Sequence, residues 1–112
     1  MTLIQTAEML EEAVDEHASV VLYSSDLCLE CDVARRYIQT LEKMYPRIEF
    51  YEVKRGRVND FERAYGLQSA PHLFFFAQGD CIGELVWDER PDFLEVKNRL
   101  EEAFAKGDKG CS

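Results

Sequence analysis

Residues 19–31 have the sequence SVVLYSSDLCLEC, in which a β-branched apolar run leads directly to two cysteines. The apolar centre of residues 19–23 is typical of a buried strand. Apolar residues then recur at helical spacing over residues 29–45, and Pro46 ends this pattern because the residue before a proline avoids the α region. The stretch therefore predicts a strand, a short loop and a long helix, with the cysteine pair at the start of the helix.

The rest of the chain alternates between spacings that are typical of strands and of helices. Strands are expected at residues 2–5, at residues 48–53 and on both sides of the hairpin signal at residues 78–80. Helices are expected at residues 6–17, with His17 on the inner face; at residues 59–65, with Asn59 or Asp60 as cap; and from Pro91 to Gly107.

This order of elements, β-α-β-α-β-α-β-β-α, predicts an α/β fold. We expect a three-layer α/β/α sandwich, in which four helices flank a central mixed sheet of four to five strands. Residues 1–106 are expected to form this single domain, and the polar residues 107–112 a flexible tail.

Composition limits the classes of function. The chain has 112 residues, which suits one domain, and its net charge of −9 argues against a nucleic-acid partner, whose phosphates would need a basic face. No apolar run approaches the ~18 residues of a membrane span. The start, MTLIQTAEML, has no basic segment of the kind that begins a signal peptide, so a cytoplasmic location is expected.

The cysteine pair could be a redox dithiol, a metal clip or two small apolar residues. At the start of a helix, free backbone N–H groups and the helix dipole favour the thiolate of Cys28, while Cys31 would lie one turn later and largely covered. An exposed nucleophile and a sheltered resolving thiol suit two-step disulfide exchange. A zinc site usually needs two close pairs, and Cys81 and Cys111 are single; we expect a small apolar role for Cys81 and an adventitious intermolecular disulfide for Cys111.

A second motif lies about forty residues after the first. In YGLQSAPHLFFF, residues 65–76, Pro71 stands directly before an apolar strand, where a cis peptide bond held in a tight turn is expected. With both motifs in place, the chain resembles the thioredoxin family over residues 2–105. The resemblance implies a thioredoxin-like fold and a thiol–disulfide oxidoreductase.

The resemblance also implies roles for particular residues. Cys28 would attack a protein or small-molecule disulfide and Cys31 would resolve the mixed disulfide. The substrate would contact the residues around the pair and the proline loop: Leu27, Leu29, Glu30, Ala70, Pro71 and Trp87. No cofactor or metal is implied, the chain is expected to be a monomer, and electrons would come from a thioredoxin-reductase-type protein or a small thiol.

The residues around the cysteines depart from the family's usual pattern. Leu27 replaces a tryptophan, and Leu29 and Glu30 replace Gly-Pro. The carboxylates of Glu30 and Asp26 would disfavour the Cys28 thiolate, which would make the pair a reductant; alternatively, they simply stabilise the start of a helix.

Further departures affect the resolving step and the groove. Leu22 replaces a buried acid, and Glu52 replaces a nearby lysine, which predicts slower resolution of the mixed disulfide. Trp87 replaces a glycine; it would narrow the groove, stand in for the missing tryptophan, or be an ordinary aromatic residue at a strand end. These departures keep an alternative function open, a thioredoxin-like binding or adaptor domain with little redox activity. His72, which follows the proline, is expected to be a packing residue more often than a functional one.

Overall fold

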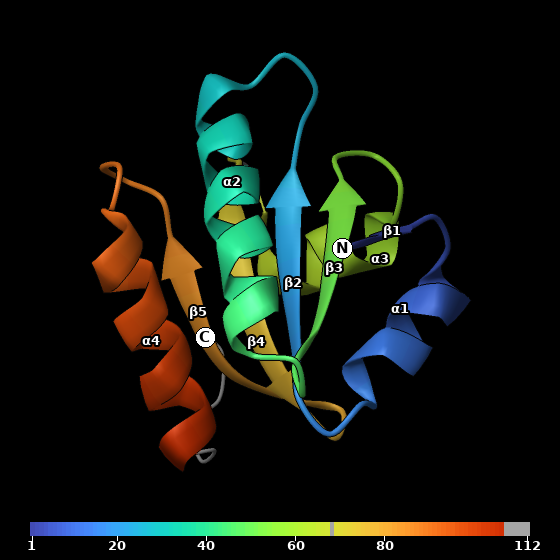
Figure 1. The fold of residues 1–112 in the computed structure, drawn as a ribbon. Helices are drawn as coiled ribbons and strands as arrows, with labels where there is room; N and C mark the ends of the chain where they lie inside the picture. The colour runs from blue at the N-terminus through green and yellow to red at the C-terminus, as the bar shows by residue number, and fades with distance from the viewer. Residues whose placement is uncertain (68, 107–112) are drawn as a thin grey trace.

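A computed structural model describes residues 1–67 and 69–106, which form five strands and four helices (Figure 1). In chain order these are β1 (Thr2–Ile4), α1 (Ala7–Val14), β2 (Ser19–Ser24), α2 (Leu29–Met44), β3 (Glu49–Lys54), α3 (Asn59–Tyr65), β4 (His72–Ala77), β5 (Asp80–Val86) and α4 (Phe93–Lys106). The expected tail at residues 107–112, with Gly107 and Cys111, lies outside the described residues.

The strands form one mixed sheet in the order β1-β3-β2-β4-β5. Strands β1, β3 and β2 are parallel, whereas β4 runs antiparallel to β2 and pairs with β5 through the hairpin. Helices α2 and α4 pack on one face of the sheet, and α1 and α3 on the other (Figure 1). The predicted three-layer α/β/α sandwich is confirmed, with five strands.

The sheet separates two apolar cores. The core under α2 and α4 is built around Val20, Leu22, Ala34, Ile38, Leu41, Phe50, Leu73, Phe75, Ile82, Leu85, Val96 and Leu100. The core under α1 and α3 is built around Ile4, Ala13, Val21, Tyr23, Val53, Val58, Phe61, Phe74 and Phe76. Successive residues of β2 and β4 alternate between the two cores, because neighbouring side chains of a strand point to opposite faces. Every residue of β2 is buried, which explains its continuous apolar run.

Helix α1 is shorter than predicted. It ends at Val14, so His17 lies beyond it and is exposed, not on its inner face. The reason is tertiary: the β4–β5 turn donates backbone hydrogen bonds from Gln78 to the Glu16 carbonyl and from Gly79 to the Val14 carbonyl. A continuing helix would need the Val14 carbonyl for itself.

Two other helix starts also differ from the prediction. Asn59 and Asp60 lie within α3, and Val58 occupies the cap position. Helix α4 begins at Phe93 rather than at Pro91, because the Asp92 side chain accepts the backbone N–H of Glu95 and so caps the first turn. Among the described residues, no helix is long and apolar enough to cross a membrane.

Candidate functional site

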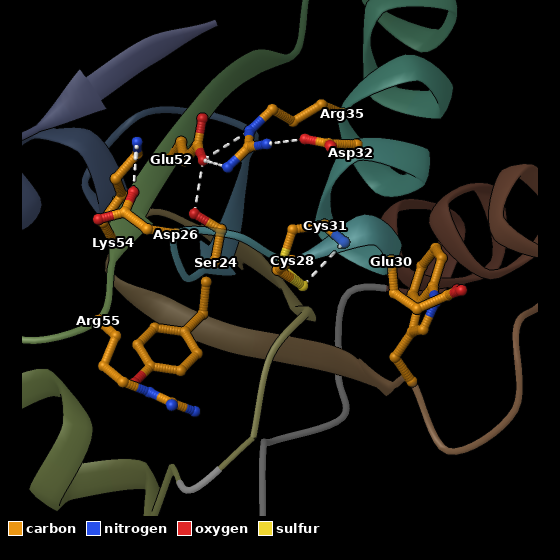
Figure 2. The surroundings of a disulfide bond; sticks show 12 residues. Ser24, Asp26, Cys28, Glu30, Cys31, Asp32, Arg35, Glu52, Lys54 and Arg55 are labelled. Atoms are coloured by element: carbon orange, nitrogen blue, oxygen red, sulfur yellow. Dashed lines mark hydrogen bonds and ion pairs between the residues drawn. A yellow bond between two sulfur atoms is a disulfide. The ribbon is translucent and has the colours of Figure 1, made fainter.

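Cys28 and Cys31 form a disulfide at the junction between β2 and α2 (Figure 2). Their Cα atoms are 5.2 Å apart, and Cys28 is the N-cap residue of α2, with an extended backbone. The backbone N–H of Cys31 donates to the Cys28 sulfur at 3.1 Å. Cys28 is half-buried, whereas Cys31 is 0% exposed. The two sulfurs therefore differ strongly in their access to solvent.

The position at the helix start favours a negative charge on the outer sulfur. In the reduced pair, the backbone N–H of Cys31 would donate to a Cys28 thiolate, and the positive end of the helix dipole would act in the same direction. Of the two cysteines, Cys28 thus has the surroundings of a nucleophile.

Two leucines next to Cys28 are exposed to solvent. Leu27 is 106% exposed and Leu29 is 81% exposed. Leu27 also has a left-handed backbone, with φ of 52°, which is unusual for a bulky residue. Such backbone conformations cluster at active sites and ligand-binding segments. Apolar side chains thus flank the accessible sulfur on both sides in the sequence.

The proline loop meets the cysteine loop at the same edge of the sheet. Tyr23 near the end of β2 is paired with His72 at the start of β4, so Pro71 lies at the edge from which the cysteine loop leaves the sheet. The Ala70–Pro71 peptide bond is cis; Pro71 is buried and Ala70 is half-buried. The fold thus brings together the two motifs that the sequence analysis singled out.

Glu30, between the cysteines, is bound to the segment that follows β5. Its Oε1 accepts the indole N–H of Trp87 at 2.9 Å and the Nε–H of Arg90 at 3.0 Å, and its Oε2 accepts an Nη2–H of Arg90 at 2.6 Å. We call this set of contacts among Glu30, Trp87 and Arg90 the Glu30 clamp. The hydrogen bonds from Arg90 and Trp87 lower the pKa of Glu30 to about 2, so the carboxylate is charged at neutral pH.

Tyr37 supports the clamp from α2. Its ring centre lies 6.0 Å from that of Trp87 and 5.7 Å from that of Phe93, and its hydroxyl donates to the Pro91 carbonyl at 2.9 Å. The segment between β5 and α4 is therefore fastened to α2 at two points, through Glu30 and through Tyr37.

The lowered pKa of Glu30 predicts how the clamp responds to acid. A carboxyl group whose folded pKa is below its ordinary value of 4.5 contributes stability that is present above pH 4.5 and is lost as the pH falls through about 2. Trp87 is the single tryptophan of the chain, so the emission of the protein reports on the clamp. We expect this emission to stay constant from neutral pH down to pH 4.5. Below pH 4.5, it should not change at a higher pH than the far-ultraviolet circular dichroism, which reports on the fold. A change of emission centred near pH 4.5, with unchanged circular dichroism, would show that Glu30 titrates as an unbound carboxyl.

A second polar cluster lies on the other side of the cysteine turn. Glu52 on β3 is paired in register with Leu22 and is largely buried. Its Oε2 accepts the Ser24 hydroxyl at 2.5 Å and the Arg35 guanidinium at 2.8 Å and 2.9 Å, and Arg35 also binds Asp32 at 2.6 Å (Figure 2). This network ties the end of β2 and the first turns of α2 to β3.

Asp26, in the loop before the cysteines, is also paired. Its carboxylate binds the Lys54 ammonium at 3.1 Å. Both acidic residues that the sequence placed near Cys28, Asp26 and Glu30, thus have cationic partners that offset their charge. A less stable Cys28 thiolate, and with it a pair that acts as a reductant, stays a prediction.

His72 is buried on the α1 and α3 side of the sheet. Its ring stacks on Phe74 with centres 4.3 Å apart, and its Nε2 lies 3.4 Å from a carboxylate oxygen of Glu84. Burial lowers the pKa of His72 and outweighs the opposing effect of Glu84. These contacts favour the packing interpretation. Within the part of the chain that the structure describes, no group of three or more His, Cys, Asp and Glu residues could hold a metal ion.

The known proteins that this chain resembles in sequence and those that it resembles in structure include thioredoxins in both comparisons. No protein-family model matches the sequence. A thioredoxin H-type protein of Populus jackii is 23% identical over 96% of this chain and 81% of its own length, and thioredoxin H9 of Arabidopsis thaliana is 24% identical over 80% and 68%. Thioredoxin structures from Plasmodium falciparum (14% identity, 91% and 98% coverage) and Fasciola hepatica (18%, 92% and 99%) both superpose with a TM-score of 0.80.

The chain has the thioredoxin fold. The resemblance deduced from CLEC and from YGLQSAP is confirmed at the level of the fold. Two departures from the thioredoxin pattern are partners in this structure, since Glu30 of the cysteine turn binds Trp87 after the last strand. Trp87 therefore lies beside the cysteine turn, as the interpretation of a substitute tryptophan required. Slower resolution because of Leu22 remains a prediction.

Several residues of the site lie outside the motifs that the sequence presents. These are Arg90, Tyr37, Ser24 and Arg35, each of which contacts Glu30, Trp87 or Glu52. One signal was available for Arg90: it is a basic residue three positions after Trp87, and the thioredoxin resemblance brings that segment close to an acidic cysteine turn.

Proposed function

We propose that this chain is a thiol–disulfide oxidoreductase that reduces protein or small-molecule disulfides through Cys28 and Cys31. The observation that carries this proposal is the Cys28–Cys31 disulfide at the start of α2, with one half-buried and one fully buried sulfur. Reversible pairing of an accessible and a sheltered cysteine is what disulfide exchange requires. The similarity to thioredoxins points in the same direction.

In the proposed reaction the Cys28 thiolate attacks one sulfur of the substrate disulfide. A bond forms between Cys28 and that sulfur, and the other substrate sulfur leaves as a thiolate. Cys31 then loses its proton and attacks the Cys28 sulfur, which closes the Cys28–Cys31 disulfide and releases the second substrate thiolate. Two electrons pass to the substrate, so a reductase of the thioredoxin-reductase type or a small thiol must reduce the pair again.

The substrate would lie across the exposed edge around Cys28. The side chains of Leu27 and Leu29 are available for apolar contacts. The backbone of Ala70, before Pro71, would pair with an extended segment of the substrate as an added strand does. Trp87 would form one side of this substrate site, and the Glu30 clamp would hold its side chain in place.

A second candidate function is a binding domain with little redox activity. The exposure of Leu27 and Leu29 favours it, because exposed large apolar side chains often mark a protein-binding surface. In that case the leucines would bind a partner whether the cysteine pair is reduced or oxidised.

Reduction of a peptide disulfide by dithiothreitol separates the two functions. We expect wild-type chain to accelerate the reaction, and Cys28→Ser to lower it to the rate of dithiothreitol alone, because the nucleophile is lost. The double variant Cys81→Ser/Cys111→Ser removes the disulfide-bonded Cys81 and the other remaining cysteine but keeps the Cys28–Cys31 pair. It is the control for loss of a cysteine elsewhere and should retain activity, since dithiothreitol in the assay reduces other disulfides. Equal rates for wild type and Cys28→Ser, together with no equilibration of the pair with glutathione, would contradict the enzyme and favour the binding domain.

A further inference from the structure

We propose that Arg90 is a positioning residue for the cysteine pair: through the Glu30 clamp it holds and neutralises the carboxylate between the cysteines, and so preserves the reactivity of Cys28. The inference rests on the proposed function for its biological meaning. Its evidence is the contact between two segments that lie 60 residues apart in the sequence.

The geometry of the clamp is more specific than that of an ordinary surface ion pair. The Arg90 guanidinium approaches both carboxylate oxygens of Glu30, through Nε at 3.0 Å and 3.2 Å and through Nη2 at 2.6 Å. Such a fork fixes direction as well as distance, which a lysine cannot reproduce. The indole N–H of Trp87 donates to the same carboxylate and leaves it little freedom to rotate.

The clamp determines where the negative charge of Glu30 lies. Figure 2 shows the Glu30 side chain directed away from Cys28 and Cys31. Glu30 is only two residues from Cys28 in the sequence and lies in the first turn of α2, so without the clamp its flexible carboxylate could turn toward the Cys28 sulfur. A carboxylate beside the Cys28 sulfur would disfavour the thiolate, because the two carry like charges. In the clamp, the positive charge of Arg90 also offsets the negative charge of Glu30.

The role in reactivity can be separated from a role in folding. The side chains of Arg90 and Glu30 are 55% and 39% exposed. Exposed ion pairs contribute little to the free energy of unfolding, so we expect Arg90 variants to fold as the wild type does. A change in Cys28 reactivity would then report on the clamp and not on a damaged fold.

The test measures alkylation of Cys28 by iodoacetamide in the reduced protein as a function of pH, with peptide mass spectrometry identifying the modified cysteine. Arg90→Gln should lower the rate at neutral pH by about threefold to tenfold, since a nearby like charge reduces the thiolate fraction by such a factor. Arg90→Lys, which keeps the charge but loses the fork, should fall between Arg90→Gln and the wild type. The redox potential of the pair should become more negative in the same order.

Two further variants make the result decisive. Arg47→Gln removes the same charge just beyond the far end of α2 and should leave the rate unchanged. In a Glu30→Gln background, Arg90→Gln should have no effect, because there is no carboxylate left to hold. The proposal is wrong if Arg90→Gln and Arg47→Gln have the same rate of Cys28 alkylation. It is also wrong if Arg90→Gln slows alkylation by the same factor in the Glu30→Gln background as in the wild type. Alkylation of Cys28 does not require catalytic turnover. If the variants show these rate differences but the wild-type chain has no reductase activity, the proposed function is wrong and the role of Arg90 stands.

Discussion

Replacing Cys31 by serine is expected to stop the reaction at the mixed disulfide. Cys28 remains half-buried and able to attack, but no second thiol lies one helical turn away to release the substrate. With an excess of an unsymmetrical peptide disulfide, the variant should gain the mass of one peptide at Cys28, and its turnover should fall to the rate of dithiothreitol alone. Mass spectrometry under non-reducing conditions measures the adduct directly.

The matched controls for this trap are Cys28→Ser and the double substitution Cys28→Ser/Cys31→Ser. Neither should form an adduct within the substituted cysteine turn, because the nucleophile is absent. An adduct of Cys31→Ser found at a position other than Cys28, or a Cys31→Ser variant with wild-type turnover, would refute the assignment of the two roles.

Replacing Arg35 by methionine is expected to lower the free energy of unfolding substantially. The Glu52 side chain is only 10% exposed, and Arg35 contacts it through two nitrogens. Removing the cation leaves a nearly buried carboxylate that still accepts a hydrogen bond from the Ser24 hydroxyl but has lost its arginine partner. Breaking such a pair from one side costs ~3–5 kcal/mol, and because Arg35 is itself 25% exposed we expect the lower end of that range. Denaturant-induced unfolding followed by circular dichroism measures it.

Two variants bracket the effect of Arg35→Met. The double variant Arg35→Met/Glu52→Leu removes both charges and should recover most of the loss, since replacing a whole buried pair by apolar side chains is often neutral. Arg36→Met, at an exposed position of the same helix, should change stability by no more than about 0.5 kcal/mol. An Arg35→Met variant as stable as Arg36→Met would mean that water reaches Glu52 and replaces the arginine.

The fold could be predicted from the sequence because its signals are local. The apolar run of β2 and the helical spacing of α2 each lie within one element, and the hairpin turn contains Gly79, a residue suited to the positive φ angle found there. The length of α1 could not be predicted in the same way, because the hairpin turn ends that helix from far along the chain.

The contacts of the site were harder to predict than its location. The motifs around Cys28 and Pro71 identify the edge of the sheet where the site lies. The partners of Glu30 and of Glu52 come from other elements, and which side chain reaches which depends on how α2 and α4 pack on the sheet. Sequence spacing carries no information about such a contact until the fold is known.

The complete burial of Cys31 makes the cysteine pair asymmetric toward molecules that arrive from solvent. Cys31 is 0% exposed in the first turn of α2, yet its sulfur is bonded to that of Cys28. The Cys31 sulfur is therefore within reach of Cys28 but shielded from a thiol or disulfide outside the protein. An incoming molecule meets the Cys28 sulfur alone, so burial decides which of the two cysteines can take part in an intermolecular exchange.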